Sequence, residues 1–237
     1  MVSNWFSKDV DLAVAAQLRT HFSQQPMMNR PFVTISRMYG CDGKELSGLI
    51  VEKMNAQEKG KNWFVVSREM LLAAAQEGKL TKETLAELER FGHSEVKSYI
   101  RDAIFGMGNL VEAVQQISHI FHLFAKRGRV IFLGGGASIV TQDLTGGTHL
   151  QLYAPEDWRI KNHARRWSLD ESVARKKVID RTVDREAFVK TFLGEDLYDN
   201  RFYHLTINNA EVSPEVAAEA VCAMIMARQE QLASRES

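Results

Sequence analysis

The chain has 237 residues, 45% hydrophobic and 25% charged, and its 30 basic and 30 acidic residues give a formal net charge of zero. This length and composition predict a sizeable core, in one α/β domain of ordinary size or in two small ones. The zero net charge argues against a nucleic-acid surface that works by bulk electrostatics. The 2 cysteines lie far apart, and neither a signal peptide nor an apolar run long enough to span a bilayer is visible. We therefore expect a cytoplasmic protein without disulfides and without a membrane partner.

Residues 1–30 form a predicted N-terminal helical extension. Ser7 is a suitable N-cap for a helix whose apolar residues keep helical spacing as far as Phe22, and Pro26 follows its end. We expect this helix to pack on the outside of the domain or on a partner, so that a homodimer is one assembly it would serve.

Residues 32–35 are a short apolar run that predicts a buried strand. The chain then passes through a loop with Gly40 and Gly43 and continues from Lys44 as a predicted helix. Strand, glycine loop and helix direct free backbone amides and the positive end of a helix dipole at one place, which suits phosphate. An ordinary βα turn is the alternative, because glycines are common there.

The glycine loop departs from the usual P-loop pattern, in which Gly, four residues, Gly, Lys and then Ser or Thr follow one another. Gly43 and Lys44 match the Gly–Lys pair, but Met38 stands at the first position and Glu45 at the last. Either this is a variant nucleotide loop or it binds no nucleotide. A helix N-terminus could lower the pKa of Cys41, but no histidine is adjacent in sequence, so a catalytic thiol is not favoured.

Residues 63–66 predict a second strand, and the polar residues Ser67 and Arg68 follow it. Such an edge suits a substrate in an open α/β sheet, although Ser67 also suits the N-cap of the next helix. Residues 79–127 predict a helical insertion. His119 and His122 lie three apart in it, a spacing that can bind a metal, but no third ligand is evident and surface or core histidines are favoured.

Residues 129–133 predict a third strand that runs into Gly134, Gly135 and Gly136, and residues 149–153 predict a fourth. Consecutive glycines at a strand end allow positive φ or close backbone approach.

Residues 156–190 are the most cationic part of the chain and predict two helices, the second opened by a capping box that begins at Ser168. They are either a solvated face with surface ion pairs or a mobile lid whose arginines close on phosphates. Residues 203–207 predict a fifth strand that ends at Asn208, and Ser213 caps the last helix. Strands that alternate with helices predict one α/β domain over residues 31–237, with a five-stranded parallel sheet, the insertion and the lid.

The order and spacing of these motifs resemble the cytidylate kinase-like proteins, a branch of the nucleoside monophosphate kinases. The similarity covers about residues 32–228 and rests on residues 33–43, 64–69, 134–137, 154–159, 184–185 and the strand that ends at Asn208. It implies a P-loop kinase fold and transfer of the ATP γ-phosphoryl group to CMP, dCMP or a related monophosphate, with Mg²⁺.

The resemblance also implies roles for residues, but it assigns no metal ligand. Those implied to hold ATP are Gly40, Cys41, Asp42, Gly43, Lys44, Glu45 and Asn208. Those implied to act on the transferred group are Lys44, Arg159, Arg165 and Arg166. Those implied to contact or border the acceptor nucleotide are Ser36, Arg37, Ser67, Arg68, Gly134, Gly135, Gly136, Arg181, Asp184 and Arg185.

Two departures from the family pattern bear on activity. The family reads Ser-Gly-Gly-Arg where this chain has Cys-Asp-Gly-Lys, so Asp42 would need to face Mg²⁺ or turn outward. The family's Gly-Arg-Gly strand end is all glycine here, and the arginine missing at Gly135 would cost about 1.5–3 kcal/mol of acceptor binding.

Three functions are therefore open. The first is ATP-dependent phosphoryl transfer to a nucleoside monophosphate. The second is a catalytically weakened nucleotide- or anion-binding module that serves as a sensor or assembly partner. The third is an α/β scaffold that binds nothing phosphorylated. In the first two, backbone amides at residues 40–44 and arginines at residues 159–185 form a shared pocket for negative charge.

Overall fold

The computed structural model describes residues 30–57, 63–66, 118, 121–122 and 124–236. The predicted N-terminal extension and most of the predicted insertion lie outside these residues, as do Ser67, Arg68 and His119.

The core of the protein is one parallel sheet. Its five strands are β1 (Phe32–Arg37), β2 (Phe64–Val66), β3 (Val130–Leu133), β4 (Gly147–Tyr153) and β5 (Leu205–Asn208), in the order β2-β3-β1-β4-β5. The predicted five-stranded parallel sheet is thus confirmed. The central strand β1 lies where the chain changes from one side of the sheet to the other, and ligands of open α/β sheets bind beyond the strand ends at such a point.

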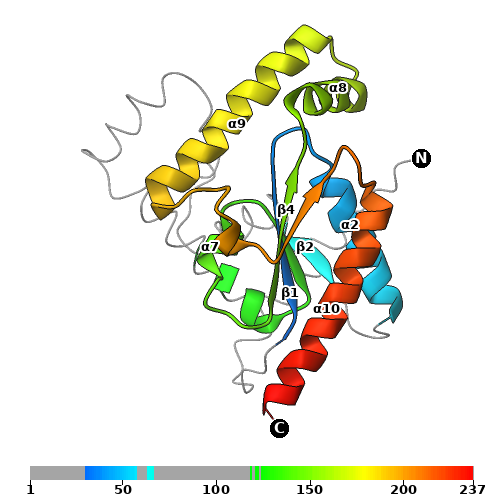
Figure 1. Ribbon diagram of the computed structural model, residues 1–237, viewed down its shortest axis with the longest axis vertical. Helices are drawn as coiled ribbons and strands as arrows, with labels where there is room; N and C mark the ends of the chain where they lie inside the picture. The colour runs from blue at the N-terminus through cyan, green and yellow to red at the C-terminus, as the bar shows by residue number, and fades with distance from the viewer. Residues whose placement is uncertain (1–29, 58–62, 67–117, 119–120, 123, 237) are drawn as a thin grey trace, which may run out of the picture.

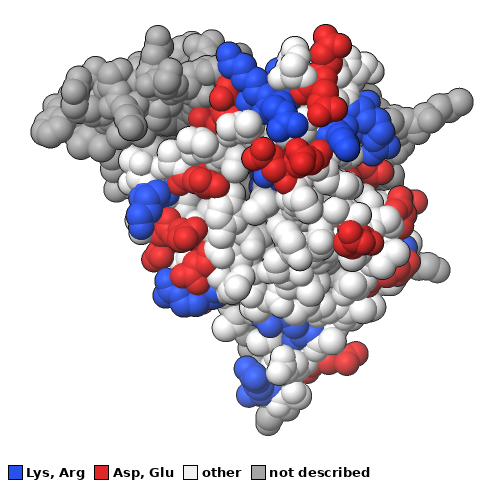
Figure 2. Space-filling model, turned by 45° about the horizontal axis from the view of Figure 1, so that its top comes forward, with Lys and Arg blue, Asp and Glu red and all other residues white. Residues whose placement is uncertain are grey.

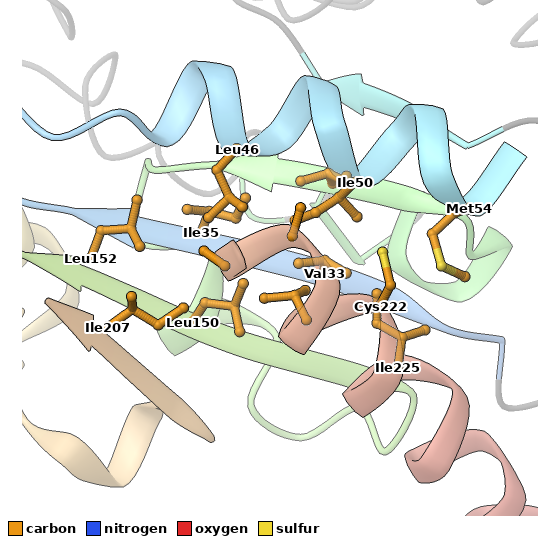
Figure 3. Packing of buried hydrophobic residues seen from close by; sticks show 14 of the residues in the cluster. Val33, Ile35, Leu46, Ile50, Met54, Leu150, Leu152, Ile207, Cys222 and Ile225 are labelled. Atoms are coloured by element: carbon orange, nitrogen blue, oxygen red, sulfur yellow. The ribbon is translucent and has the colours of Figure 1, made fainter. Parts of the chain in front are cut away.

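The helices α2 (Gly43–Gln57) and α10 (Pro214–Glu236) lie side by side on one face of the sheet (Figure 1). Figure 3 shows how side chains of both helices meet the strands. The buried residues of this α2–α10 core include Val33, Ile35, Leu46, Ile50, Met54, Leu150, Leu152, Ile207, Cys222 and Ile225. Each large side chain buried here contributes about 1.5–3 kcal/mol through the hydrophobic effect.

The other face of the sheet carries an aromatic core. Phe32, Phe64 and Phe132 come from three strands, and Phe121 and Phe124 pack on them with edge-to-face ring contacts. Successive strand residues point to opposite faces, which is why Phe32 belongs to this core and Val33 to the α2–α10 core. Burial on both faces explains why β2 and β3 are continuous apolar runs in the sequence.

Above the carboxyl ends of the strands lie α8 (Glu156–Trp167) and α9 (Glu171–Leu193), the segment predicted as a lid; we refer to these two helices as the lid (Figure 1). The two helices were predicted, but the capping box at Ser168 is wrong. Ser168 instead ends α8 with a left-handed φ of 50°, and Asp170 is the N-cap of α9. The amide of Leu169 donates to the carbonyl of Ala164, so the chain must turn before a new helix begins.

Smaller differences concern element ends. The structure adds a short helix α7 (Ala137–Val140) and a 3₁₀ turn (Asn200–Phe202), and β5 begins only at Leu205. No described helix is both long and apolar enough to cross a bilayer.

Candidate functional site

The β1–α2 loop (residues 38–42) approaches the lid closely at Gly40. This glycine has a φ of 98°, and a Cβ there would lie 2.7 Å from the backbone oxygen and 2.8 Å from the Cβ of Arg159. Only glycine, which has no side chain, adopts this positive φ without strain and fits into the space beside Arg159. The residue therefore brings the loop into contact with α8.

Arg159 ties this loop to both helices of the lid. Its Nη1 donates to the backbone oxygen of Tyr39 at 3.0 Å and to Oγ1 of Thr182 at 3.1 Å, and its Nε donates to the backbone oxygen of Ala154 at 3.0 Å. The side chain is buried. In this arrangement Arg159 positions the loop. The family resemblance had implied that Arg159 acts on the transferred phosphoryl group.

Asp42, the last residue of the loop, is buried at 5% exposure. Its amide donates to Oδ1 of Asn209 at 2.7 Å, and its carboxylate accepts from Nδ2 of Asn162 at 2.7 Å and forms an ion pair with Arg166. The carboxylate therefore neither turns outward nor stands alone, because the lid supplies its partners. Of the two arrangements expected for Asp42, facing Mg²⁺ or turning outward, the second is not seen here.

Asn162 and Asn209 belong to this site and were missed by sequence reasoning. Asn162 also donates to the backbone oxygen of Gly40 at 2.8 Å and accepts from Nη2 of Arg165 at 2.8 Å. A signal for Asn162 was present, because it lies three residues after Arg159 and four before Arg166, on one face of α8. Asn209 directly follows Asn208, the last residue of β5, and the resemblance implied that the residues after Asn208 also border the site.

The N-terminal turn of α2 carries both signs of charge. Lys44 and Glu45 are exposed, and Arg166 reaches Oε2 of Glu45 at 3.7 Å as well as Asp42. Figure 2 shows basic and acidic side chains intermixed at the lid end of the molecule. The sequence predicted that arginines of the lid converge on this loop. In the structure these arginines contact backbone carbonyl oxygens and carboxylates of the loop and of the first turn of α2.

A second group of cations lies at the end of β1. The Arg185 Nη1 donates to the backbone oxygen of Arg37 at 3.1 Å, and its guanidinium carbon lies 4.9 Å from the centre of the Tyr39 ring. Burial, then the charge of Arg185, holds the pKa of Arg37 well below its usual value. Burial also lowers the pKa of Arg185.

The remaining predicted residues take the following places. Ser36 is buried in β1, and Oδ1 of Asn208 accepts from the amide of Ala210 at 3.1 Å in a turn. Arg181 and Asp184 form a 3.9 Å ion pair on α9. His122 contacts Asp143, and within the described residues no group of three or more His, Cys, Asp or Glu side chains suits a metal ion.

The loop thiol is not activated. Burial raises the pKa of Cys41 to about 12, so the lowering that a helix N-terminus could produce is overcome. This agrees with the low rank that the sequence gives to a catalytic thiol.

A hollow of about 500 Å³ lies between Tyr39 and α9. Lys176, Lys177 and Arg181 line it together with Asp180. Its size is in the range of small-molecule sites, and its lining favours an anionic ligand.

No curated protein matches the chain. The solved structure of an uncharacterized protein from Eubacterium ventriosum is similar, with a TM-score of 0.61 and 16% identity over 84% of this chain and 99% of that chain, which shows the shared fold alone. A sequence model of the cytidylate kinase-like family matches residues 32–211. Since that match includes the strands, the loop and the lid described above, the chain belongs to the cytidylate kinase-like family.

Proposed function

We propose that this protein transfers the γ-phosphoryl group of ATP to a nucleoside monophosphate, with CMP and dCMP as the first acceptors to test. The observation that carries the proposal is the meeting of lid cations with the N-terminus of α2. Arg166 reaches Asp42 and Glu45 there, although more than a hundred residues separate them in sequence. Guanidinium groups at a helix N-terminus suit phosphate oxygens.

The described residues also fit a nucleotide with its metal. Arg166 and Asn162 are donors that a phosphate group would accept from, and they now serve the Asp42 carboxylate. Carboxylates are hard oxygen ligands, so the exposed Glu45 at the start of α2 suits Mg²⁺. When bound, Mg²⁺ would neutralise charge on the donor phosphates.

In this proposal the chain contributes mainly position and charge. The loop holds the donor phosphates against α2, with Lys44 in the first turn of that helix. Arg165 and Arg166 cover the transferred group from α8, while Arg159 keeps the lid and the loop in register through its hydrogen bonds to Tyr39 and Thr182. Phosphoryl transfer of this type depends chiefly on such positioning.

The test is formation of ADP from ATP and Mg²⁺ in the presence of CMP, dCMP, UMP, AMP or GMP. We expect turnover with at least one acceptor, and a fall in kcat of about a hundredfold in Lys44→Ala without loss of folding. Lys190→Ala is a matched control, because Lys190 is an exposed lysine at the far end of α9. Well-folded protein that forms no ADP with any acceptor would reject the proposal.

A second candidate is a nucleotide- or anion-binding module without turnover. Two contacts favour it. The Asp42 amide already donates to Asn209, and the Asp42 carboxylate already engages Arg166 and Asn162, so neither the amide nor these two side chains would be available to a phosphate without rearrangement. Thermal stabilisation by ATP without formation of ADP would support this candidate.

A further inference from the structure

The hollow beside Tyr39 is built mostly from residues that the proposed function leaves unused. Residues of α9 that are four apart in sequence form neighbouring rows along the helix. A third row, next to the two that line the hollow, turns towards α8, where Ala174 and Val178 are buried with Ile160. The hollow therefore lies along a strip of α9 beside the strip that packs on α8. The two rows that line it are Ser172, Lys176 and Asp180, and Val173, Lys177 and Arg181.

Two lysines of the hollow lack an acidic partner. Arg181 forms an ion pair with Asp184 at 3.9 Å, so the protein offsets part of its charge. Lys176 and Lys177 are exposed, and no ion pair joins either of them to a carboxylate of the described residues, Asp180 in the same hollow included. Ammonium groups that stand together in a concave site attract an anion.

The other parts of the lining are apolar. The Tyr39 ring borders the hollow, and Val173 on the helix is 43% exposed. The lysine side chains add their methylene stems to this surface. An anion that also carries an apolar or aromatic body would remove these surfaces from water, which a bare phosphate ion would not.

Tyr39 connects the hollow to the β1–α2 loop and to α8. Its ring contacts the His163 ring with centroids 5.1 Å apart, and its backbone oxygen accepts from Arg159. His163 is buried, and within the described part of the chain its Nε2 has no hydrogen-bond partner. Burial, then the charges of Lys177 and Arg166, lowers the pKa of His163. A ligand between Tyr39 and Lys177 would thus touch the loop and α9 at once, beside an imidazole whose hydrogen bonding is incomplete.

We propose that this hollow is a second ligand site, separate from the donor and acceptor sites of the proposed function, for a small organic anion with an apolar or aromatic body. Lys176 and Lys177 hold the anionic group, and Tyr39 and Val173 hold the body. Because the ligand spans the loop and α9, its binding fastens these two segments together. The site therefore takes an effector that changes how the lid is held, and the ligand undergoes no reaction there.

Phenyl phosphate, inorganic phosphate and phenol are probes that separate the two parts of such a ligand. Amide NMR of the full chain follows each titration through the shifts of residues 172–181. We expect phenyl phosphate to bind at these residues about tenfold more tightly than either of the other probes, because it alone meets both the lysines and the apolar lining. Equal affinity for phenyl phosphate and inorganic phosphate would overturn the proposal, as would phenyl phosphate that shifts none of these residues.

Two matched pairs of variants on α9 locate the binding. Val173→Glu and Val183→Glu place the same carboxylate at exposed valines of one helix, but of the two only Val173 lines the hollow. Lys177→Gln and Lys190→Gln each remove one exposed lysine charge, and only Lys177 lines it. We expect Val173→Glu and Lys177→Gln to weaken phenyl phosphate roughly three- to tenfold, and the two controls to bind it as wild type. All four positions are exposed, so the variants should fold, and equal effects within either pair would overturn the proposal.

Hydrogen exchange tests the coupling to the lid. Saturating phenyl phosphate should slow amide exchange in residues 171–181 and leave β4 unchanged, because the ligand joins the first half of α9 to the loop. Val173→Glu at the same concentration should show no such slowing. Unchanged exchange in wild-type protein with the ligand bound would rule out an effector site.

Competition with nucleotides separates this inference from the proposed function. We expect phenyl phosphate to shift residues 172–181 equally with and without saturating ATP and Mg²⁺, and equally in Lys44→Ala. Displacement by ATP or by a nucleoside monophosphate, or loss of binding in Lys44→Ala, would assign the hollow to the nucleotide site and overturn the inference. Binding that passes these tests in a protein that forms no ADP keeps the inference and rejects phosphoryl transfer.

Discussion

Asp42 shows how a buried carboxylate is accommodated in the β1–α2 loop. Arg166 and Asn162 on the lid engage it, so its charge is offset although the side chain is buried. The same two donors are those that a nucleotide phosphate would approach. Under the proposed function the carboxylate would therefore compete with a phosphate for the lid, and the ion pair with Arg166 connects lid and loop in this structure.

Asp42→Asn tests this competition. Asparagine keeps an oxygen that can accept from Asn162 but loses the charge that attracts Arg166, so we expect ATP with Mg²⁺ to bind roughly two- to fivefold more tightly. Isothermal titration measures the change, with Asp157→Asn on the exposed side of the lid as control. Weaker binding would instead mean that the carboxylate belongs to the nucleotide or magnesium site.

The two cysteines lead to a prediction about reactivity. Burial raises the pKa of Cys41 to about 12 and that of Cys222 to about 11, so both thiols stay protonated near neutral pH. Since the thiolate is the reactive form, native protein should take up iodoacetamide slowly at pH 7.5. Mass spectrometry should show full labelling of both residues after unfolding in guanidinium chloride. Rapid native labelling of Cys41 would contradict the burial seen in the loop.

At the scale of elements, β4 carries a buried histidine into the sheet. His149 bonds through Nδ1 with Oγ1 of Thr34 at 2.9 Å, and its ring stacks on His204 with centroids 5.0 Å apart. Burial, then His204 and Arg228, lowers the pKa of His149 to about 3. The histidine is therefore neutral in the folded protein near neutral pH.

This burial makes stability depend on pH. An unfolded histidine titrates near pH 6.5 and the folded one near 3, so between these values the unfolded chain binds a proton that the folded chain does not. The free energy of unfolding should be fully retained above about pH 6.5 and fall on acidification, by up to about 1.4 kcal/mol per pH unit from this residue. Urea unfolding between pH 7.5 and 5 measures the slope. His149→Gln should flatten it, and an unchanged slope would assign the effect to other groups.

Element types were predictable where local pattern and burial agree. The run Val130–Leu133 is buried on both faces and has no other plausible state than a strand, and the Ser213–Pro214 start of α10 depends on neighbouring residues alone. The ends of β5 and α8 were not predictable. The hydroxyl of Tyr203 donates to the carbonyl of Leu197 before the strand begins, and Ser168 takes a left-handed conformation that the residue pattern of a capping box does not reveal.

At the scale of the whole molecule, the sequence predicted which segments meet but not through which atoms. Loop and lid were expected to share a site, and in the structure the two segments are in contact. The hydrogen bond from Asn162 to Asp42 spans 120 residues and depends on the angle at which α8 crosses the loop. No local pattern encodes that angle. The same holds for Arg37, whose position over Gly134 depends on β1 and β3 being neighbours in the sheet.

The lid and the sheet differ in how they are held. Counting the described residues alone, the α2–α10 core contains 15 buried residues, whereas the cluster between α8 and α9 contains 3, Ile160, Ala174 and Val178. Polar contacts of Arg159, Asn162 and Arg166 supply the rest of the attachment of α8. The far half of α9 is anchored separately, because Val189 packs in a cluster with Ile139, Leu197 and Phe202. Among the described residues, the sheet is thus held by more apolar packing than α8 and the first half of α9.

We therefore expect α8 and the first half of α9 to open as a unit without unfolding of the sheet, because they bury little apolar surface. In hydrogen exchange followed by mass spectrometry, amides of α8 should exchange at a lower opening free energy than those of β1 and β4. Arg166→Gln removes one contact to the loop and should speed exchange in α8 while leaving β4 unchanged. Conversely, ATP with Mg²⁺ should slow exchange in α8, since it gives the lid a second ligand to close on. Equal protection of α8 and β4 would mean that lid and sheet form one cooperative unit, and closure of the lid could then not accompany nucleotide binding.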